Sequence, residues 1–188
     1  MTSNFIIRRA TVEDAPQLSL LGRKTFYETY TNELSIDLDS QRIEEYVERE
    51  HSVQAYCETI NDPLQGVWIV FNENGNKEEP IAYAVATRFN LLPDYSSDPN
   101  DFGIKRIYVR RDYQGKQIGW KLMTEIIVWF KTVTPQPNRI LLRVHSKNLK
   151  AIRFYEKYGF EQLDEQSLRL GERIYNIFSY DLSHRAEQ

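Results

Sequence analysis

Two glycines and a lysine lie where one predicted strand passes into a predicted helix. Gly115, Lys116 and Gly119 follow the apolar stretch 103–109 and open the helical stretch 116–131. The first amides of a helix have no partner within it, and they carry the positive end of the helix dipole. Glycines let a phosphate approach that backbone closely, and a lysine adds charge. The segment is therefore either a phosphate-binding turn or a plain strand-to-helix turn in which glycine serves only the bend.

A second segment, 142–160, is predicted to run from strand through loop to helix. It places Asn148, Ala151 and Tyr155 at successive steps of three and four residues, which puts them on one helical face. Asn148 suits a helix N-cap, and Gly159 suits the residue that follows a helix end. A phenol with an ordinary pKa of about 10 is protonated at neutral pH and can donate a proton. Taken alone, Asn148 could serve only as a cap and Tyr155 only as a packing aromatic.

The rest of the chain predicts the elements that position these two segments. Alternating or β-branched apolar runs predict strands at 5–8, 66–71, 80–88, 103–109, 139–144, about 160–163, and 174–180. Helical spacing predicts helices after Thr11, over 41–60, over 116–131 and over 148–158. In the polar stretch 41–60, a break near His51 and Ser52 is left open. The order βααβββαβαββ predicts an α/β fold with a mixed central sheet of about six to seven strands flanked by helices. No repeat or linker interrupts it, so we expect a single domain over 1–188 with its core at about 4–181.

The two segments together resemble the GNAT family of N-acetyltransferases, over roughly residues 4–181. The family's pyrophosphate motif, Gln/Arg-x-x-Gly-x-Gly/Ala after a strand, corresponds to Gln114–Gly119. Its next motif is complete here, in Val144, Asn148, Ala151, Phe154, Tyr155, Gly159 and Phe160. Gln117 departs from the pattern, because the family usually has glycine there. A side chain at this position is tolerable if its φ angle stays negative.

The resemblance implies that acetyl-CoA lies in an opening between the fourth and fifth strands, 103–109 and 139–144. Backbone amides near Ile107, Tyr108 and Val109 would hold the pantetheine and the thioester carbonyl. The pyrophosphate would be held by Gln114, Gly115, Lys116, Gln117, Ile118 and Gly119. Asn148 would contact the pantetheine arm, with Ala151 and Phe154 lining the cleft. Tyr155 would act as the catalytic acid that protonates the CoA sulfur, while the amine attacks the thioester directly.

The general base is left open. Many members of the family carry a glutamate on the fourth strand, whereas this chain has Lys105 and Arg106 there. Asp101, Asp112 and Glu28 are candidates, and a chain of water molecules is another.

The stretch 25–50 combines acidic and aromatic residues and is the candidate acceptor site. Its substrate-binding candidates are Phe26, Glu28, Tyr30, Asp37 and Asp39. Carboxylates and aromatic rings suit a small polycation, through ion pairing and cation–π contacts. The stretch also loosely resembles family members that acetylate polyamines. A solvated helix face is the other interpretation of such a charge run.

We therefore expect an acetyl-CoA-dependent N-acetyltransferase that acts on a primary amine of a small, polyamine-like molecule. One alternative is acetylation of a protein or peptide N-terminus or lysine. A second alternative, of another class, is a non-catalytic acyl-CoA-binding regulatory module, which the Gln117 departure and the unreadable base would favour. The expected partners are acetyl-CoA and the amine, and the chain would be a monomer or homodimer.

Composition and motifs disfavour several other classes of protein. The 24 basic and 27 acidic residues give a net charge of −3, which disfavours binding to nucleic acid or to an anionic membrane. The N-terminus lacks the apolar run of a signal peptide, and the longest apolar run, 126–130, is far too short to span a membrane. The single cysteine, Cys57, fits a reducing compartment, so we expect a cytoplasmic protein. No motif has metal-ligand spacing, so no metal is expected.

Overall fold

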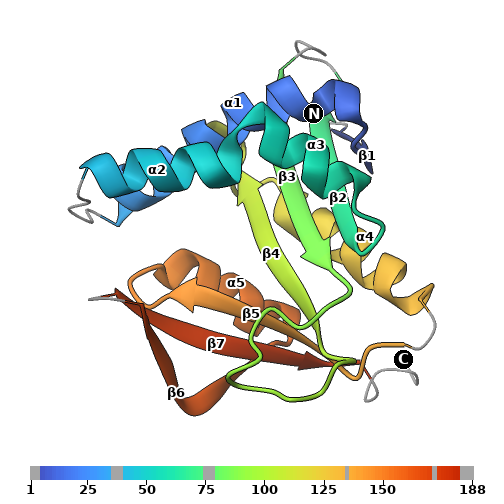
Figure 1. The fold of residues 1–188 in the computed structure, drawn as a ribbon, viewed down its shortest axis with the longest axis vertical. Coiled ribbons are helices and arrows are strands. Elements are labelled where there is room, and N and C mark those ends of the chain that lie inside the picture. The colour runs from blue at the N-terminus through green and yellow to red at the C-terminus, as the bar shows by residue number, and fades with distance from the viewer. Residues whose placement is uncertain (1–4, 35–39, 74–78, 134–135, 171–172, 183–188) are drawn as a thin grey trace. The chain divides into compact units, whose positions relative to one another are not determined.

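The computed structural model describes residues 5–34, 40–73, 79–133, 136–170 and 173–182 (Figure 1). Its strands are β1 (Phe5–Arg9), β2 (Gln65–Asn72), β3 (Pro80–Thr87), β4 (Phe102–Val109), β5 (Arg139–His145), β6 (Glu161–Leu170) and β7 (Arg173–Asp181). Its helices are α1 (Ala15–Tyr27), α2 (Ser40–His51), α3 (Val53–Asn61), α4 (Ile118–Lys131) and α5 (Leu149–Tyr158). A π-helical turn, Glu28–Glu33, continues α1. The predicted α/β class is confirmed.

The break that the sequence indicated near His51 and Ser52 is confirmed. The stretch 41–60 divides at Ser52, whose extended backbone (φ −71°, ψ 160°) ends α2 and whose side chain accepts a hydrogen bond from the Ala55 amide. A serine that satisfies a free helical amide in this way starts a new helix. The predicted order therefore gains one helix between the first two strands.

The seven strands form one mixed sheet in the order β1-β2-β3-β4-β5-β7-β6. β1 and β2 are antiparallel, as are β5 and β7, whereas β4 pairs with β5 in parallel through Phe102–Ile140 and Gly103–Leu141. β6 is longer than expected, since only 160–163 was predicted as strand and it extends to Leu170. The predicted mixed sheet of six to seven strands is confirmed.

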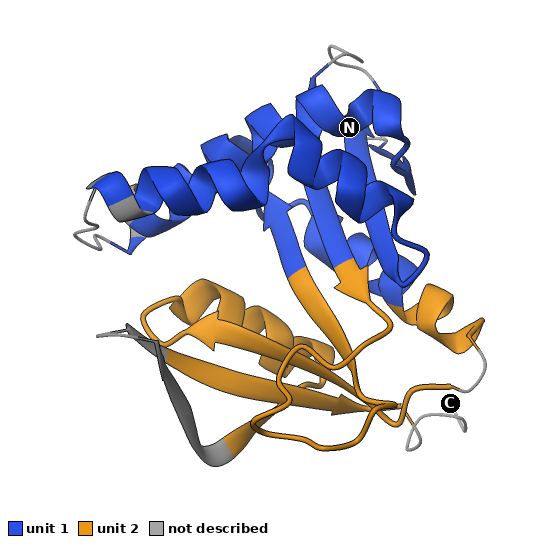
Figure 2. Ribbon diagram, in the orientation of Figure 1, with its two compact units in different colours: residues 1–85, 106–126 blue, residues 86–105, 127–188 orange. Residues whose placement is uncertain are grey.

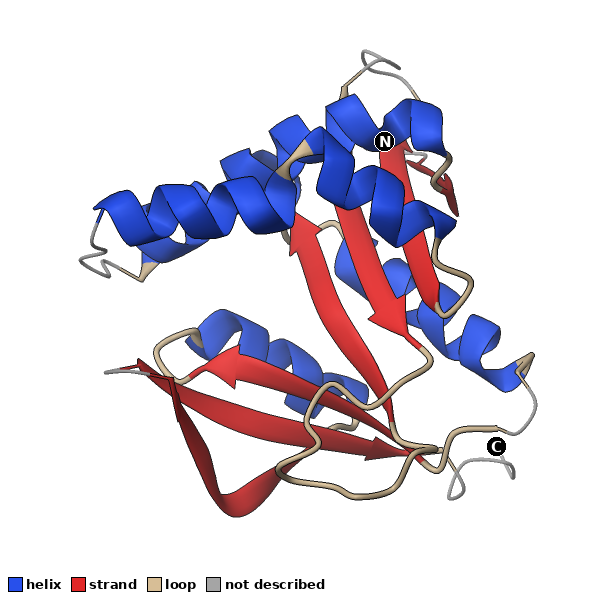
Figure 3. Cartoon of the chain, viewed as in Figure 1, coloured by secondary structure: helices blue, strands red, loops and turns tan. Residues whose placement is uncertain are grey.

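The chain divides into two compact units, residues 1–85 with 106–126 and residues 86–105 with 127–188 (Figure 2). The expectation of a single domain over the whole chain stays a prediction. In the first unit, α1 and α3 cover one face of β2 and β3 (Figure 3). The core there is made by Ala15, Leu18, Leu21, Tyr56, Val67, Ile69, Phe71, Tyr83 and Val85. All eight residues of β3 are buried, and Pro80 stands at its first position, where a missing amide donor costs least.

In the second unit, β5 pairs with β7 along its whole length, from Arg139–Asp181 to His145–Tyr175. The loop before β4 is tied to β5 by Asp101, whose buried carboxylate accepts from Arg139 Nη2 at 2.7 Å. These contacts hold the start of β4 and all of β5 in fixed register. Over the ranges that the structure describes, no helix has both the length and the apolar character needed to cross a membrane.

Candidate functional site

The predicted phosphate turn is an exposed loop at the start of α4. Gln114, Gly115, Lys116 and Gln117 are exposed, whereas Ile118, the first helical residue, is buried. Within the described part of the chain, the amides of residues 115–119 donate no hydrogen bond, and the first backbone bond runs from the Lys121 amide to the Gln117 carbonyl at 3.1 Å. Five consecutive donors at a helix N-terminus are suited to binding an anion.

Two residues of this turn have left-handed backbone conformations. Gly115 has a φ of +77°, which glycine adopts freely, and a Cβ built there would meet nothing within 4 Å. Gln117 has a φ of +63°, and among the described residues it is the one non-glycine with a positive φ. The condition of a negative φ at Gln117 is therefore not met. The turn needs a residue with a left-handed backbone directly before α4. Here that residue is a glutamine, whose Cβ makes the conformation sterically unfavourable.

The charged side chains beside the turn differ in whether they form ion pairs. Arg110 pairs with Glu79 and with Asp112, whose Oδ2 lies 2.9 Å from Arg110 Nη2. Lys116 lies over the Tyr113 ring at 4.6 Å, and it forms no ion pair with any residue that the structure describes. Lys116 is thus an exposed cation at this turn that a ligand could contact. Asp112, one candidate base, is already neutralised by Arg110.

The strand that leads to this turn carries the three residues predicted to bind the thioester arm. Ile107, Tyr108 and Val109 are half-buried at the end of β4, and the next amide, Arg110, donates to the Ile81 carbonyl at 2.9 Å. The Tyr108 ring stacks on the buried Tyr83 ring, with centroids 5.8 Å apart. The end of β4 is therefore held against β3 in the first unit.

The second predicted segment starts α5 with an asparagine cap. Asn148 Oδ1 accepts from the Ala151 amide at 3.1 Å, and the Asn148 amide donates to the His145 carbonyl at 2.8 Å. The predicted cap is confirmed. Asn148 Nδ2 donates to no residue in the described ranges, so capping leaves one amide group available. Ala151 and Phe154 follow, both half-buried.

Tyr155 lies in an aromatic surrounding in the second unit. The residue is 8% exposed, and its ring has edge contacts with Phe154 and Phe160, with centroids 5.2 Å and 5.5 Å away. Burial raises the pKa of the Tyr155 phenol well above the usual 10. Its hydroxyl makes no hydrogen bond to a described residue. The group therefore stays protonated throughout the neutral range and keeps its proton available.

The residues predicted to bind the acceptor differ in how exposed they are. Phe26 is 5% exposed, and its ring packs on Tyr30 at 4.7 Å and Tyr46 at 5.2 Å in a cluster between α1 and α2. Glu28 and Tyr30 are half-buried in the π-helical turn, an irregularity that is frequent at functional sites. Asp37 and Asp39 lie outside the described residues. Phe26 thus packs within this cluster, Glu28 and Tyr30 keep accessible surface, and the binding roles of all three stay predictions.

Two further features concern the base. Asp101 is fully buried and accepts from both Arg139 and Ser96, so its carboxylate is committed to structure. Arg106, the residue on the fourth strand, is buried and pairs with Glu50 at the end of α2. Sequence reasoning missed this pairing. The one available signal was a charged residue between Ile104 and Tyr108, on the inward-facing side of a strand.

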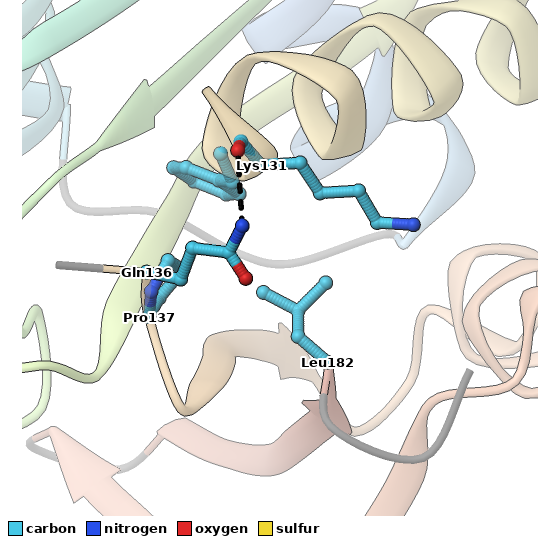
Figure 4. A pocket seen from close by; sticks show the side chains of 5 residues that line it. Lys131, Gln136, Pro137 and Leu182 are labelled. Atoms are coloured by element: carbon cyan, nitrogen blue, oxygen red, sulfur yellow. Dashed lines mark hydrogen bonds between the residues drawn. The ribbon is translucent and has the colours of Figure 1, made fainter. Parts of the chain in front are cut away.

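A small cavity of about 190 Å³ lies at the end of α4 in the second unit (Figure 4). Phe130, Lys131, Gln136, Pro137 and Leu182 line it, and Gln136 Nε2 donates to the Lys131 carbonyl at 3.2 Å across it. None of the predicted site residues is among them. No group of three metal-ligating side chains occurs in the described ranges.

Similar proteins were found by sequence and by fold. Residues 26–160 match the model of the acetyltransferase (GNAT) family. A probable spermine N(1)-acetyltransferase of Bacillus subtilis subsp. natto is 29% identical over 75 residues, 39% of this chain and 49% of that protein. The spermine/spermidine N(1)-acetyltransferase of Bacillus subtilis strain 168 matches with the same identity and extent. The chain thus spans about half the length of the curated relatives it matches.

Solved structures resemble the whole chain at low sequence identity. The PaiA N-acetyltransferase from Thermoplasma acidophilum in complex with coenzyme A superposes with a TM-score of 0.72 at 20% identity, over 94% of this chain and 99% of that one. NAA60 from Arabidopsis thaliana, in complex with a bisubstrate analogue, has a TM-score of 0.63 at 17% identity, over 95% and 98% of the two chains. These structures share the fold described above. Because the family model covers well over half of the 188 residues, the chain belongs to the acetyltransferase (GNAT) family.

Proposed function

We propose that this protein transfers the acetyl group of acetyl-CoA directly to a primary amine of a small molecule. The observation that carries the proposal is the run of unused amides at residues 115–119, in the turn that matches the family's pyrophosphate motif. Two phosphates carry the charge and the acceptor oxygens that such a run of donors needs. Lys116, which is exposed and has no ion-pair partner among the described residues, adds a positive charge.

The remaining donor contacts follow from the family's pattern. Amides at Ile107, Tyr108 and Val109 hold the pantetheine and the thioester carbonyl, and Asn148 Nδ2 donates to the pantetheine arm. Ala151 and Phe154 contribute apolar surface beside it. The available Nδ2 of Asn148 and the half-buried position of Ala151 and Phe154 support these roles.

The chemical step needs one proton donor. The neutral amine nitrogen bonds to the thioester carbonyl carbon, the carbon–sulfur bond breaks, and the sulfur takes the Tyr155 proton. The amine proton passes to water, and Tyr155 recovers a proton from water. Burial supports this role, because a phenol whose pKa is raised remains in the donating form. Asp101 and Asp112 are occupied by arginines, so of the candidate carboxylates Glu28 alone is left to assist water.

A polyamine is the favoured acceptor. The curated relatives are named for spermine and spermidine, and the match to them covers 39% of this chain. Glu28 and Tyr30 provide a carboxylate and an aromatic ring with accessible surface, which suits a cation. Asp37 and Asp39 would add charge to the same segment. Cytoplasmic location and a monomer or homodimer remain predictions.

A CoA-release assay over a panel of amines tests the proposal. We expect release with spermidine or spermine that exceeds release with amino acids, aminoglycosides and peptides. Release with peptides alone would instead identify a protein or peptide acetyltransferase. Acetyl-CoA binding without release for any amine would identify a regulatory module.

The acceptor segment has its own test. Replacing Asp37 and Asp39 together with asparagine is expected to raise the KM for spermidine and to leave the KM for acetyl-CoA unchanged. Added salt should raise the spermidine KM of the parent, since screening weakens exposed charges beyond about 10 Å at 0.1 M. An unchanged spermidine KM and salt dependence in the variant would exclude these two residues from the site.

A further inference from the structure

We propose that His145 is a positioning residue that fixes the start of α5, and with it Asn148 and Tyr155. The inference rests on the proposed function, because it concerns how that site is held in place. His145 is the last residue of β5, and its Nδ1 accepts a hydrogen bond from the Lys147 amide at 3.2 Å. Its carbonyl accepts from the Asn148 amide at 2.8 Å. His145 therefore accepts hydrogen bonds from two backbone amides of the turn that leads into α5.

The imidazole itself is held by the sheet. His145 is 7% exposed and lies opposite Tyr175 of β7 at the end of the antiparallel ladder. The two rings make an edge contact at 5.2 Å with an angle of 70° between their planes. Since β5 pairs with β7 along all of its residues, the ring is fixed to a rigid element. The hydrogen bond from the Lys147 amide to His145 Nδ1 thus fixes the turn relative to the sheet.

The turn in question carries the groups assigned to the reaction. Asn148 has a non-helical backbone conformation, φ −82° and ψ 68°, directly before the first residue of α5. Its Oδ1 caps α5 while its Nδ2 is left for the ligand. Tyr155 follows on the same helical face two turns later. A displacement of the turn moves both groups, and a misplacement of about 1 Å can cost a reaction about 100-fold.

The contact makes a specific demand on the side chain at position 145. Nδ1 must be unprotonated to accept an amide hydrogen, so the neutral ring carries its hydrogen on Nε2. Asparagine offers Oδ1 as an acceptor at a corresponding distance from the backbone, without a ring. Phenylalanine offers the ring that packs on Tyr175, without an acceptor. These two substitutions separate the hydrogen bond from the packing.

The experiment compares His145→Asn with His145→Phe in the full chain. We expect His145→Phe to lower kcat for CoA release about 10- to 100-fold, and His145→Asn to stay within about threefold of the parent. The Lys147 and Asn148 amides should exchange hydrogen faster in His145→Phe than in His145→Asn. His145→Leu, which also lacks an acceptor, replaces the phenylalanine variant if that variant fails to fold, as judged by its thermal unfolding.

The outcomes are separable from those of the proposed function. A kcat of a folded His145→Phe within twofold of the parent, or an equal loss in His145→Asn, would overturn the positioning role. If the parent itself released no CoA with any amine, the proposed function would fail. The inference would then be judged by the amide exchange and by the affinity for acetyl-CoA. Equal exchange and equal affinity in the two variants would overturn it.

Discussion

Arg106 of β4 and Glu50 of α2 form an ion pair, with Nη2 2.7 Å from Oε2, although 56 positions separate them in the chain. The Arg106 side chain is 5% exposed and that of Glu50 21%. A buried guanidinium cannot lose its charge. The stability of the folded protein therefore depends on the carboxylate that faces this group. The pair joins the end of α2 to the strand that carries Ile107, Tyr108 and Val109.

Glu50→Gln should therefore destabilise the protein by about 3 kcal/mol, because it leaves Arg106 buried without a counter-charge. Urea unfolding at neutral pH measures this. The control is Glu48→Gln, which breaks an exposed ion pair with Arg23 and should cost less than about 1 kcal/mol. Replacing Glu50 and Arg106 together with methionine should recover most of the loss. A Glu50→Gln cost no larger than that of Glu48→Gln would contradict this account.

Gln117→Gly should stabilise the protein by about 0.5–1 kcal/mol. The substitution relieves a left-handed φ of +63°, worth about 1–2 kcal/mol, and part of the gain is offset by the greater freedom of glycine in the unfolded chain. Gln114→Gly is the matched control, because Gln114 has a φ of −65° and should lose stability on the same change. Chemical denaturation of both variants decides the point, and equal losses would show that Gln117 is not strained.

The Asp14 carboxylate should make stability depend on pH at the acid end. Hydrogen bonds from Arg8 lower the pKa of Asp14 below its usual 3.8, against the opposing effect of burial, and the Thr11 amide lowers it further. Because the folded pKa lies below the unfolded one, the contribution is fully present above about pH 4 and is lost as the pH falls through the folded pKa. Asp14→Asn should cost about 2 kcal/mol at pH 7. The gap between parent and variant should narrow below pH 4, as acid titrations of unfolding would reveal; a gap independent of pH would disprove the assignment.

Tyr155→Phe should lower kcat by about 10²–10⁴-fold and leave the KM for acetyl-CoA unchanged. The hydroxyl has no hydrogen-bond partner among the described residues, so its removal should leave the unfolding free energy nearly unchanged. Tyr158→Phe, on the same helix, is the control and should retain the parent kcat. Steady-state CoA release measures both. If Tyr155→Phe kept kcat within about twofold, Tyr155 would be a packing residue and water would protonate the sulfur.

Local patterns in the sequence predicted most of the fold. Strands and helices followed from apolar spacing, and the Asn148 cap and the Gly159 helix end followed from residue types with specific backbone preferences. The break of 41–60 into two helices was indicated near His51 and Ser52, and it occurs where Ser52 caps α3, a position that serine favours. The outer part of β6, residues 164–170, has few apolar residues, so its extended form follows from pairing with β7 rather than from its own pattern.

Glycine and asparagine spacing pointed to the turn 114–119 and the start of α5, and the structure has a strand-to-helix turn and an asparagine cap there. The binding roles of these residues stay predictions. The ion pair of Arg106 with Glu50 joins elements that are far apart in sequence, so no local sequence pattern predicts it. A side chain at position 117 was expected to be tolerable if its φ stayed negative, whereas the turn holds Gln117 at a positive φ, which residue type alone does not reveal. Phe26 was predicted to bind the acceptor; its ring lies in the cluster between α1 and α2, and its role toward the acceptor stays a prediction.

The complete burial of β3 has a consequence for the chain before it folds. Residues 65–72 and 80–87 contain no charged side chain, and they are rich in valine, isoleucine, alanine and aromatic residues. Short uncharged segments with high β-propensity pair readily with copies of themselves when exposed. Glu79 and Arg88 flank the second segment, and Pro80 opens it, so it begins and ends at residues that oppose intermolecular pairing. β3, which contributes to the core of the first unit, is thus also a segment of the nascent chain that needs protection from self-association.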